Sequence, residues 1–178
     1  MQPTGSRSRR RAFTLIEMSL ALAMSLGIAA AIVGLMQQQV TFTNVLSKFQ
    51  FLRDDAPQIN LLLSNLVNKA DSYRIYKTRS NAVNLSSAVQ TGGSAVRLRF
   101  RNPDGSASHA IIVFETLSGK KQLNFYYRPN ETAAWPSQPS WTISSKPSLV
   151  DFSNDTGILL IKMTGPNDEE ITYAGNPS

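Results

Sequence analysis

The sequence predicts an α+β protein in which a long N-terminal helix, transmembrane in its first half, packs on an antiparallel β-sheet. Three observations predict this fold. A stretch of thirty residues, Met18 to Ser47, carries no charge. Apolar residues then recur at helical spacing, and the rest of the chain alternates between short strand patterns and turn residues. A length of 178 residues suits one domain with an appendage.

The membrane segment is predicted from the apolar block Phe13 to Met36. Its 24 residues span about 36 Å as a helix, enough for a hydrocarbon core of about 30 Å. A cleaved secretory signal has a shorter apolar region of about 7–15 residues, although small residues such as Ala21 and Ala23 keep that alternative open. Four arginines precede the block: Arg7, Arg9, Arg10 and Arg11. The positive-inside rule therefore places this basic leader in the cytoplasm and the rest of the chain outside it.

A continuation of the helix is predicted over residues 37–70. A first apolar stripe has members three or four residues apart, and Phe51 falls off it: Phe42, Val45, Leu46, Phe49 and Leu52. The segment Asp54 to Pro57 predicts a kink or a restart, because proline disfavours helix before it and aspartate is a good N-cap. A second stripe follows: Ile59, Leu62, Leu63, Leu66, Val67 and Ala70. Both stripes need a partner surface.

Strands over residues 71–178 supply that surface as an antiparallel meander with one solvated face. Strands are expected at 73–76, 96–101, 111–114, 123–127, 141–143, 149–152, 158–163 and 170–173. Turns are expected at 102–105 and 118–121, and loops at 82–93 and 129–139. Alternation puts Arg97, Arg99 and Arg101 on a solvated strand face, with a DNA-contacting stripe as the alternative. Trp135 is either an exposed contact point or a cover for the core.

Composition excludes several function classes. The net charge is +6, but without the four leader arginines 14 basic residues face 12 acidic ones, a net charge of +2, which argues against a nucleic-acid partner. The absence of cysteine excludes disulfide scaffolds, zinc ribbons and thiol enzymes. The single histidine, His109, is expected in a surface turn. No catalytic or metal-ligating motif is present, so no enzyme activity and no cofactor are expected.

Two acidic clusters are interpreted as turn-formers, with calcium binding as the alternative because clustered loop oxygens suit that ion. They are Asp151, Asn154 and Asp155, and Asn167, Asp168, Glu169 and Glu170.

Glu17 is the single charged residue of the apolar block. A carboxylate is costly inside a membrane, so it needs a hydrated position near the surface, a proton, a lipid headgroup or a positive group on another subunit.

The string Arg10-Arg11-Ala12-Phe13-Thr14-Leu15-Ile16-Glu17-Met18 resembles the cleavage and methylation motif of type IV prepilins and pseudopilins. The resemblance implies cleavage between Ala12 and Phe13 by a prepilin peptidase and methylation of the new N-terminus at Phe13. It implies that Glu17 meets the N-terminal amine of a neighbouring subunit during assembly. The family usually has glycine where this chain has Ala12, and often a proline near Gly34.

The resemblance thus implies residues 1–12 as a leader, 13–36 as a transmembrane helix and 37–178 as a pilin-like domain. It predicts a minor pilin or pseudopilin, loosely similar to J-type or W-type minor members, in a type IV pilus or a type II secretion pseudopilus. The partners would be other subunits and the inner membrane, with the C-terminal domain periplasmic or in an extracellular filament. The alternative is an exported binding module tethered by one transmembrane helix.

Overall fold

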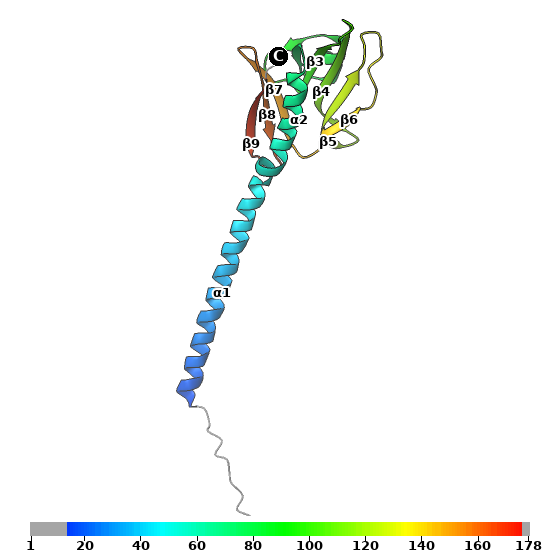
Figure 1. Cartoon of the computed structure of the whole chain (residues 1–178). Coiled ribbons are helices and arrows are strands. Elements are labelled where there is room, and N and C mark those ends of the chain that lie inside the picture. The colour runs from blue at the N-terminus through cyan, green and yellow to red at the C-terminus, as the bar shows by residue number, and fades with distance from the viewer. Residues whose placement is uncertain (1–13, 176–178) are drawn as a thin grey trace, which may run out of the picture. The chain divides into compact units, whose positions relative to one another are not determined.

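The computed structural model describes residues 14–175 and confirms the predicted α+β class (Figure 1). Contacts divide the chain after Val45 into two compact units. The helices are α1 (Leu15–Gln50), α2 (Ala56–Asn68) and α3 (Arg79–Asn84), and a π-helical turn, η1 (Phe51–Asp55), separates α1 from α2. The strands are β1 (Ser72–Tyr76), β2 (Ala88–Val89), β3 (Ala95–Arg101), β4 (Ala107–Leu117), β5 (Lys120–Arg128), β6 (Trp141–Ser144), β7 (Leu149–Asp155), β8 (Ile158–Thr164) and β9 (Glu170–Gly175).

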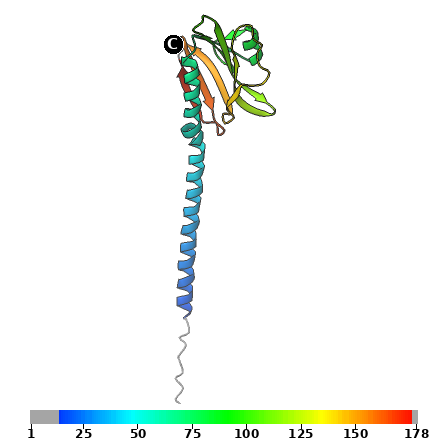
Figure 2. The ribbon, with the colours of Figure 1, turned by 45° about the vertical axis from the view of Figure 1, so that its right-hand side comes forward.

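The strands form two antiparallel sheets rather than one continuous meander. A six-stranded sheet has the order β2-β1-β3-β4-β5-β6, and a three-stranded sheet has the order β7-β8-β9. Backbone hydrogen bonds of 3.1 and 2.7 Å between Gly93 and Phe152 join the two sheets. A Cβ atom on Gly93 would lie 2.2 Å from Cγ2 of Ile75, so only glycine permits this close approach. Figure 2 shows the orange and red strands of the small sheet beside α2.

The main core forms where α2 packs against β9 and β6. The buried face of the helical segment comprises Phe51, Ala56, Ile59, Leu63 and Val67. This corrects the first predicted stripe, since Phe49 is 56% exposed and Phe51 is 2% exposed. The reason is the π-helical turn, in which the amide of Ala56 donates to the carbonyl of Phe51 five positions earlier. This bond rotates the apolar face relative to a regular α-helix.

The predicted kink or restart is therefore a π-helical turn. Asp55 precedes α2, but its side chain makes no capping hydrogen bond. Pro57 lies in the first turn of α2, where its missing N–H costs no intrahelical bond. A Cβ atom on Gly165 would lie 2.5 Å from Cδ1 of Phe51, so the turn after β8 leaves room for that ring.

The second face of the large sheet is covered, which corrects the prediction of a solvated face. A smaller core of buried residues lies there: Tyr76, Ala82, Ala95, Ile111, Val113 and Tyr126. Helix α3 and the loop after β5 cover this smaller core. Helix α3 overlaps the segment 82–93, which was expected to be a loop. Val83 and Trp135 pack against this core, so Trp135 is a core cover. The unbroken apolar run Ala110 to Phe114 is the sequence signal for a strand buried on both faces.

Candidate functional site

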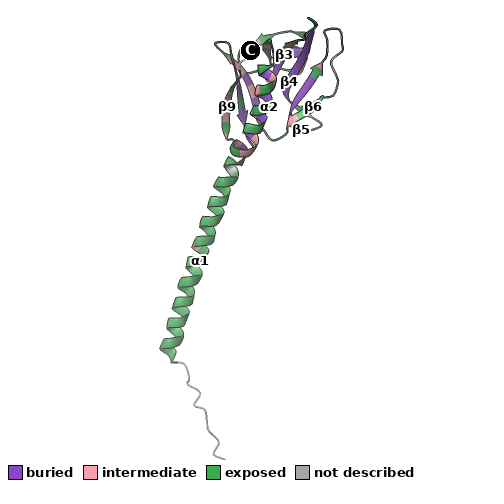
Figure 3. Cartoon of the chain, in the orientation of Figure 1, coloured by how far each residue is buried: buried purple, intermediate pink, exposed green. Residues whose placement is uncertain are grey.

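The first candidate site is the N-terminal part of α1, an apolar helix that is exposed within the described residues 14–175 (Figure 3). Its large apolar side chains from Leu15 to Met36 are 51–89% exposed, and the helix contains a stretch with mean hydropathy 2.2. By length and composition, this one helix could cross a membrane. A helix that is apolar all round needs lipid or other helices around it.

Four hydroxyl groups of α1 donate to carbonyls of the helix itself. Ser25 donates to the carbonyl of Ala21 at 2.8 Å, and Thr41 donates to that of Gln37 at 3.0 Å. Ser19 and Thr43 make equivalent bonds to earlier carbonyls. In hydrocarbon every polar hydrogen needs an internal acceptor, so these bonds make Ser19 and Ser25, which lie in the apolar block, compatible with lipid.

Glu17 closes a capping box at the start of α1. Oε2 of Glu17 accepts hydrogen bonds from the backbone N–H of Thr14 at 2.8 Å and from its hydroxyl at 2.9 Å. The amide of Glu17 donates in return to Oγ1 of Thr14 at 3.3 Å. This pattern satisfies orphan donors of the first helical turn and places the negative charge at the positive end of the helix dipole.

The two oxygens of Glu17 differ in their partners. Both capping bonds use Oε2, and within residues 14–175 no hydrogen bond reaches Oε1. The carboxylate therefore caps its own helix and still offers an acceptor to a second group. The predicted processing residues Ala12 and Phe13 and the leader arginines Arg7, Arg9, Arg10 and Arg11 lie outside the described residues.

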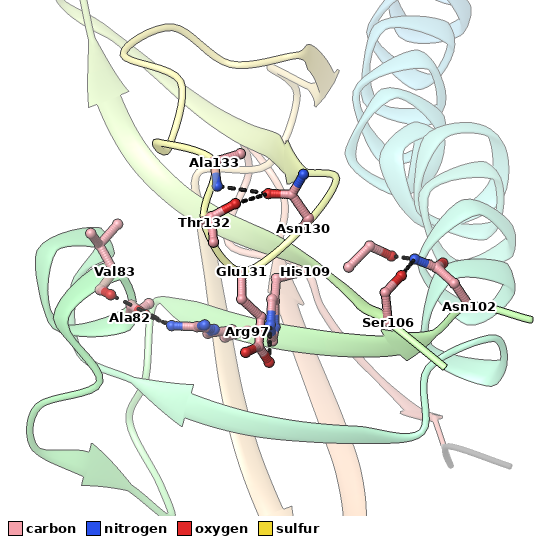
Figure 4. A network of polar contacts seen from close by, with 11 residues as sticks. Ala82, Val83, Arg97, Asn102, Ser106, His109, Asn130, Glu131, Thr132 and Ala133 are labelled. Atoms are coloured by element: carbon pink, nitrogen blue, oxygen red, sulfur yellow. Dashed lines mark hydrogen bonds and ion pairs between the residues drawn. The ribbon is translucent and has the colours of Figure 1, made fainter. Parts of the chain in front are cut away.

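The second candidate site is a basic cluster that includes Arg97 and His109, two residues that were expected at the surface and are buried. His109 lies on β4 and is 6% exposed, which corrects the expected surface turn. Arg97 on β3 is 8% exposed, which corrects the expected solvated face at that position. Figure 4 shows Arg97, His109 and Glu131 lying together. Arg99 and Arg101 are exposed as expected.

Arg97 is buried because its guanidinium has a structural role. Its Nη1 donates to the carbonyls of Ala82 at 3.0 Å and Val83 at 3.5 Å near the C-terminal end of α3. The guanidinium also lies 5.4 Å from the ring centre of Trp135. A cation at the negative end of a helix is favourable, so Arg97 fastens α3 to the sheet. Burial lowers the pKa of Arg97, and the charge of Arg128 lowers it further.

His109 has no hydrogen-bond partner at either ring nitrogen within the described part of the chain. Its Nε2 lies 3.6 Å from Oε1 of Glu131, which is too long for a hydrogen bond. Desolvation lowers the pKa of His109, and the charges of Arg97 and Arg128 lower it further, while Glu131 raises it. His109 is therefore neutral at pH 7.

The lowered pKa of His109 predicts a pH-dependent stability. Because the unfolded chain binds a proton at about pH 6.5 and the folded chain binds it only at lower pH, acidification favours unfolding. The free energy of unfolding should fall as pH drops below about 6.5, by at most about 1.4 kcal/mol per pH unit from this group. Urea unfolding followed by tryptophan fluorescence measures it, since Trp135 and Trp141 both lie in the globular unit. His109→Leu should have a smaller slope, and equal slopes would contradict this assignment.

The acidic clusters considered for calcium do not converge on a common point. Oδ1 of Asn154 accepts from Tyr73 and from the backbone of Gly157, and Glu170 pairs with Lys162 at 2.9 Å. Among residues 14–175, no group of three or more histidine, cysteine, aspartate or glutamate side chains is arranged to hold a metal ion.

Comparison with known proteins finds no matching family model, no similar curated protein and no similar solved structure.

Proposed function

We propose that this chain is a minor pilin or pseudopilin, a structural subunit that enters a type IV pilus or a type II secretion pseudopilus through its N-terminal helix. A prepilin peptidase would cleave between Ala12 and Phe13 and methylate Phe13. The helix would anchor the precursor in the inner membrane, with the globular unit on the periplasmic side. The role is structural, without catalysis or cofactor.

The observation that carries the proposal is Glu17 in the first turn of a helix that has no other charged residue before Lys48. A passive membrane anchor needs no acid in its first turn, and an unpaired carboxylate there is costly. The capping box stabilises this carboxylate in the single chain but occupies only Oε2. The protonated amine of a neighbouring subunit could pair with the same carboxylate, so that assembly in register neutralises two charges in the membrane.

The exposed apolar residues beyond the membrane block support the same role. Phe42, Val45, Leu46 and Phe49 are 46–64% exposed. They lie beyond Met36, so a helix that ends its lipid contact there leaves them in need of a protein partner. A bundle of sibling helices in a filament core would cover them.

Processing provides the direct test. The leader carries four arginines and almost no apolar residues, so it stays in the cytoplasm and cleavage must precede the helix. The mature chain should have 166 residues (178 minus 12) and begin at N-methylated Phe13. Intact mass and N-terminal sequencing of protein from membranes will decide. Ala12→Leu, which enlarges the residue before the cut, should leave the full-length chain.

A different start would identify the alternative. A mature chain beginning after Ala23 or Ala31 would mean ordinary signal-peptide cleavage and would reject the pilin assignment. A full-length chain in membranes that contain an active prepilin peptidase would favour an exported module tethered by one helix.

A further inference from the structure

Two rows of basic side chains cross the second face of the large sheet. The strand register places Arg74 opposite Arg97, and it places His109 between Arg99 and Arg128. These five side chains lie on β1, β3, β4 and β5. Like charges directly opposite each other on a sheet destabilise it, so the register brings together groups that repel.

A cavity of about 430 Å³ opens among these residues. All four arginines and His109 line it, and among the described residues Glu131 is the only acidic one in its lining. With His109 neutral, four positive charges face one negative charge, a local excess of +3. The other lining residues that the structure describes are neutral: Ser72, Tyr73, Tyr76, Leu85 and Leu98.

Several polar atoms of this lining lack partners inside residues 14–175. Both ring nitrogens of His109, the hydroxyl of Tyr76 and Nε of Arg128 are buried without a hydrogen bond. Arg97 uses only Nη1 for its bonds to α3. Buried polar groups are ordinarily paired. A neutral imidazole has one N–H donor, so His109, the hydroxyl of Tyr76 and Nε of Arg128 together leave three buried donors unused on residues that line one cavity, which indicates a missing acceptor.

We propose that this cavity binds a small phosphate-type oxyanion, either inorganic phosphate or the phosphate group of a soluble monoester. Guanidinium groups match phosphate oxygens with paired N–H donors, and a neutral imidazole adds one further N–H donor. A dianion would neutralise most of the local excess charge and relieve the repulsion between opposed arginines.

The surroundings favour a small ion over nucleic acid. Nucleic-acid surfaces are extended basic faces with exposed aromatic rings for stacking. Here the loop that carries Glu131 borders the cavity, the rings of Tyr76 and Tyr126 are fully buried, and Trp135 covers the core. The net charge without the leader arginines is only +2 (14 basic and 12 acidic residues).

The single histidine makes a specific test possible. The full chain in non-ionic detergent, labelled with ¹³C at Cε1 of histidine, has one such signal. Inorganic phosphate added at constant ionic strength should shift that signal saturably, whereas chloride should not. Arg74→Gln and Arg99→Gln change exposed residues of the lining, so each should fold and should weaken phosphate binding by about tenfold.

Two further variants separate this site from general charge effects. Arg101→Gln removes an exposed arginine of the same strand that does not line the cavity, so phosphate affinity should stay unchanged. Glu131→Gln removes the single competing carboxylate, so phosphate should bind several times more tightly. Unchanged phosphate affinity in Glu131→Gln would contradict a phosphate bound among the arginines beside Glu131.

Four results would overturn the proposal. These are the absence of a saturable shift, an equal response to chloride, an equal loss in Arg101→Gln, or a response to a short oligonucleotide but none to phosphate. A shift seen with phosphate esters as well as with phosphate would extend the site to soluble monoesters. The outcome is independent of leader cleavage and filament assembly.

Discussion

Glu17→Ala should be nearly absent from assembled filaments while its expression, its leader cleavage and the stability of its globular unit stay unchanged. In the assembled state the substitution leaves a neighbour's amine in the membrane without its counter-charge. Breaking a buried pair from one side is strongly unfavourable, so incorporation should fall below about a tenth of that of the unmodified chain. Co-purification with sheared filaments or with sibling subunits measures this.

The capping box complicates that experiment, and a second variant resolves it. Alanine removes both the charge and the bonds from Glu17 to Thr14. Glu17→Gln keeps a side chain that can complete a capping box but removes the charge. If charge pairing drives assembly, glutamine should fail as alanine does. Thr14→Ala removes the hydroxyl and keeps the charge, so it should assemble nearly normally.

Three outcomes would change this account. Recovery of assembly in Glu17→Gln would assign the residue to helix capping alone. Equal incorporation of Glu17→Ala would remove any assembly role from the carboxylate. A loss of stability in the globular unit would instead mean that the first turn of α1 contributes to that unit.

Phe51→Ala should cause the largest loss of folding stability among single substitutions in the helical segment. The side chain is 2% exposed and packs in the main core with Ala56 and Ile59. Truncating a buried phenylalanine costs about 3–5 kcal/mol, because both the transfer energy and the packing are lost. Urea unfolding followed by tryptophan fluorescence should give this difference in the free energy of unfolding.

Phe49→Ala is the matched control two residues away. Phe49 is 56% exposed, so its loss should change the unfolding free energy by less than about 0.5 kcal/mol. A regular α-helix predicts the opposite ranking, since Phe49 belongs to the first apolar stripe and Phe51 does not. A larger effect at Phe49 than at Phe51 would therefore contradict the π-helical turn.

Local patterns in the chain predicted most of the secondary structure. The thirty uncharged residues before Lys48 predicted the long helix, and alternation such as Val96, Leu98 and Phe100 predicted strands that the structure contains. The motif around Glu17 led to the assembly hypothesis. The secondary-structure predictions succeed because helix length, strand periodicity and turn chemistry depend on neighbours in sequence, whereas the assembly hypothesis stays a prediction.

Long-range packing decided the remainder. Because of the π-helical turn, Phe51 rather than Phe49 lies in the core. Helix α3 and the loop that carries Trp135 cover the face of the sheet on which Arg97 and His109 are buried. Period-two alternation tells which residues share a face but not whether something covers that face. The basic cavity arises only from cross-strand register, which places Arg74 beside Arg97 and His109 beside Arg128 although they are distant along the chain. Such pairings depend on which strands become neighbours, and the spacing of residues along one strand carries no information about that choice.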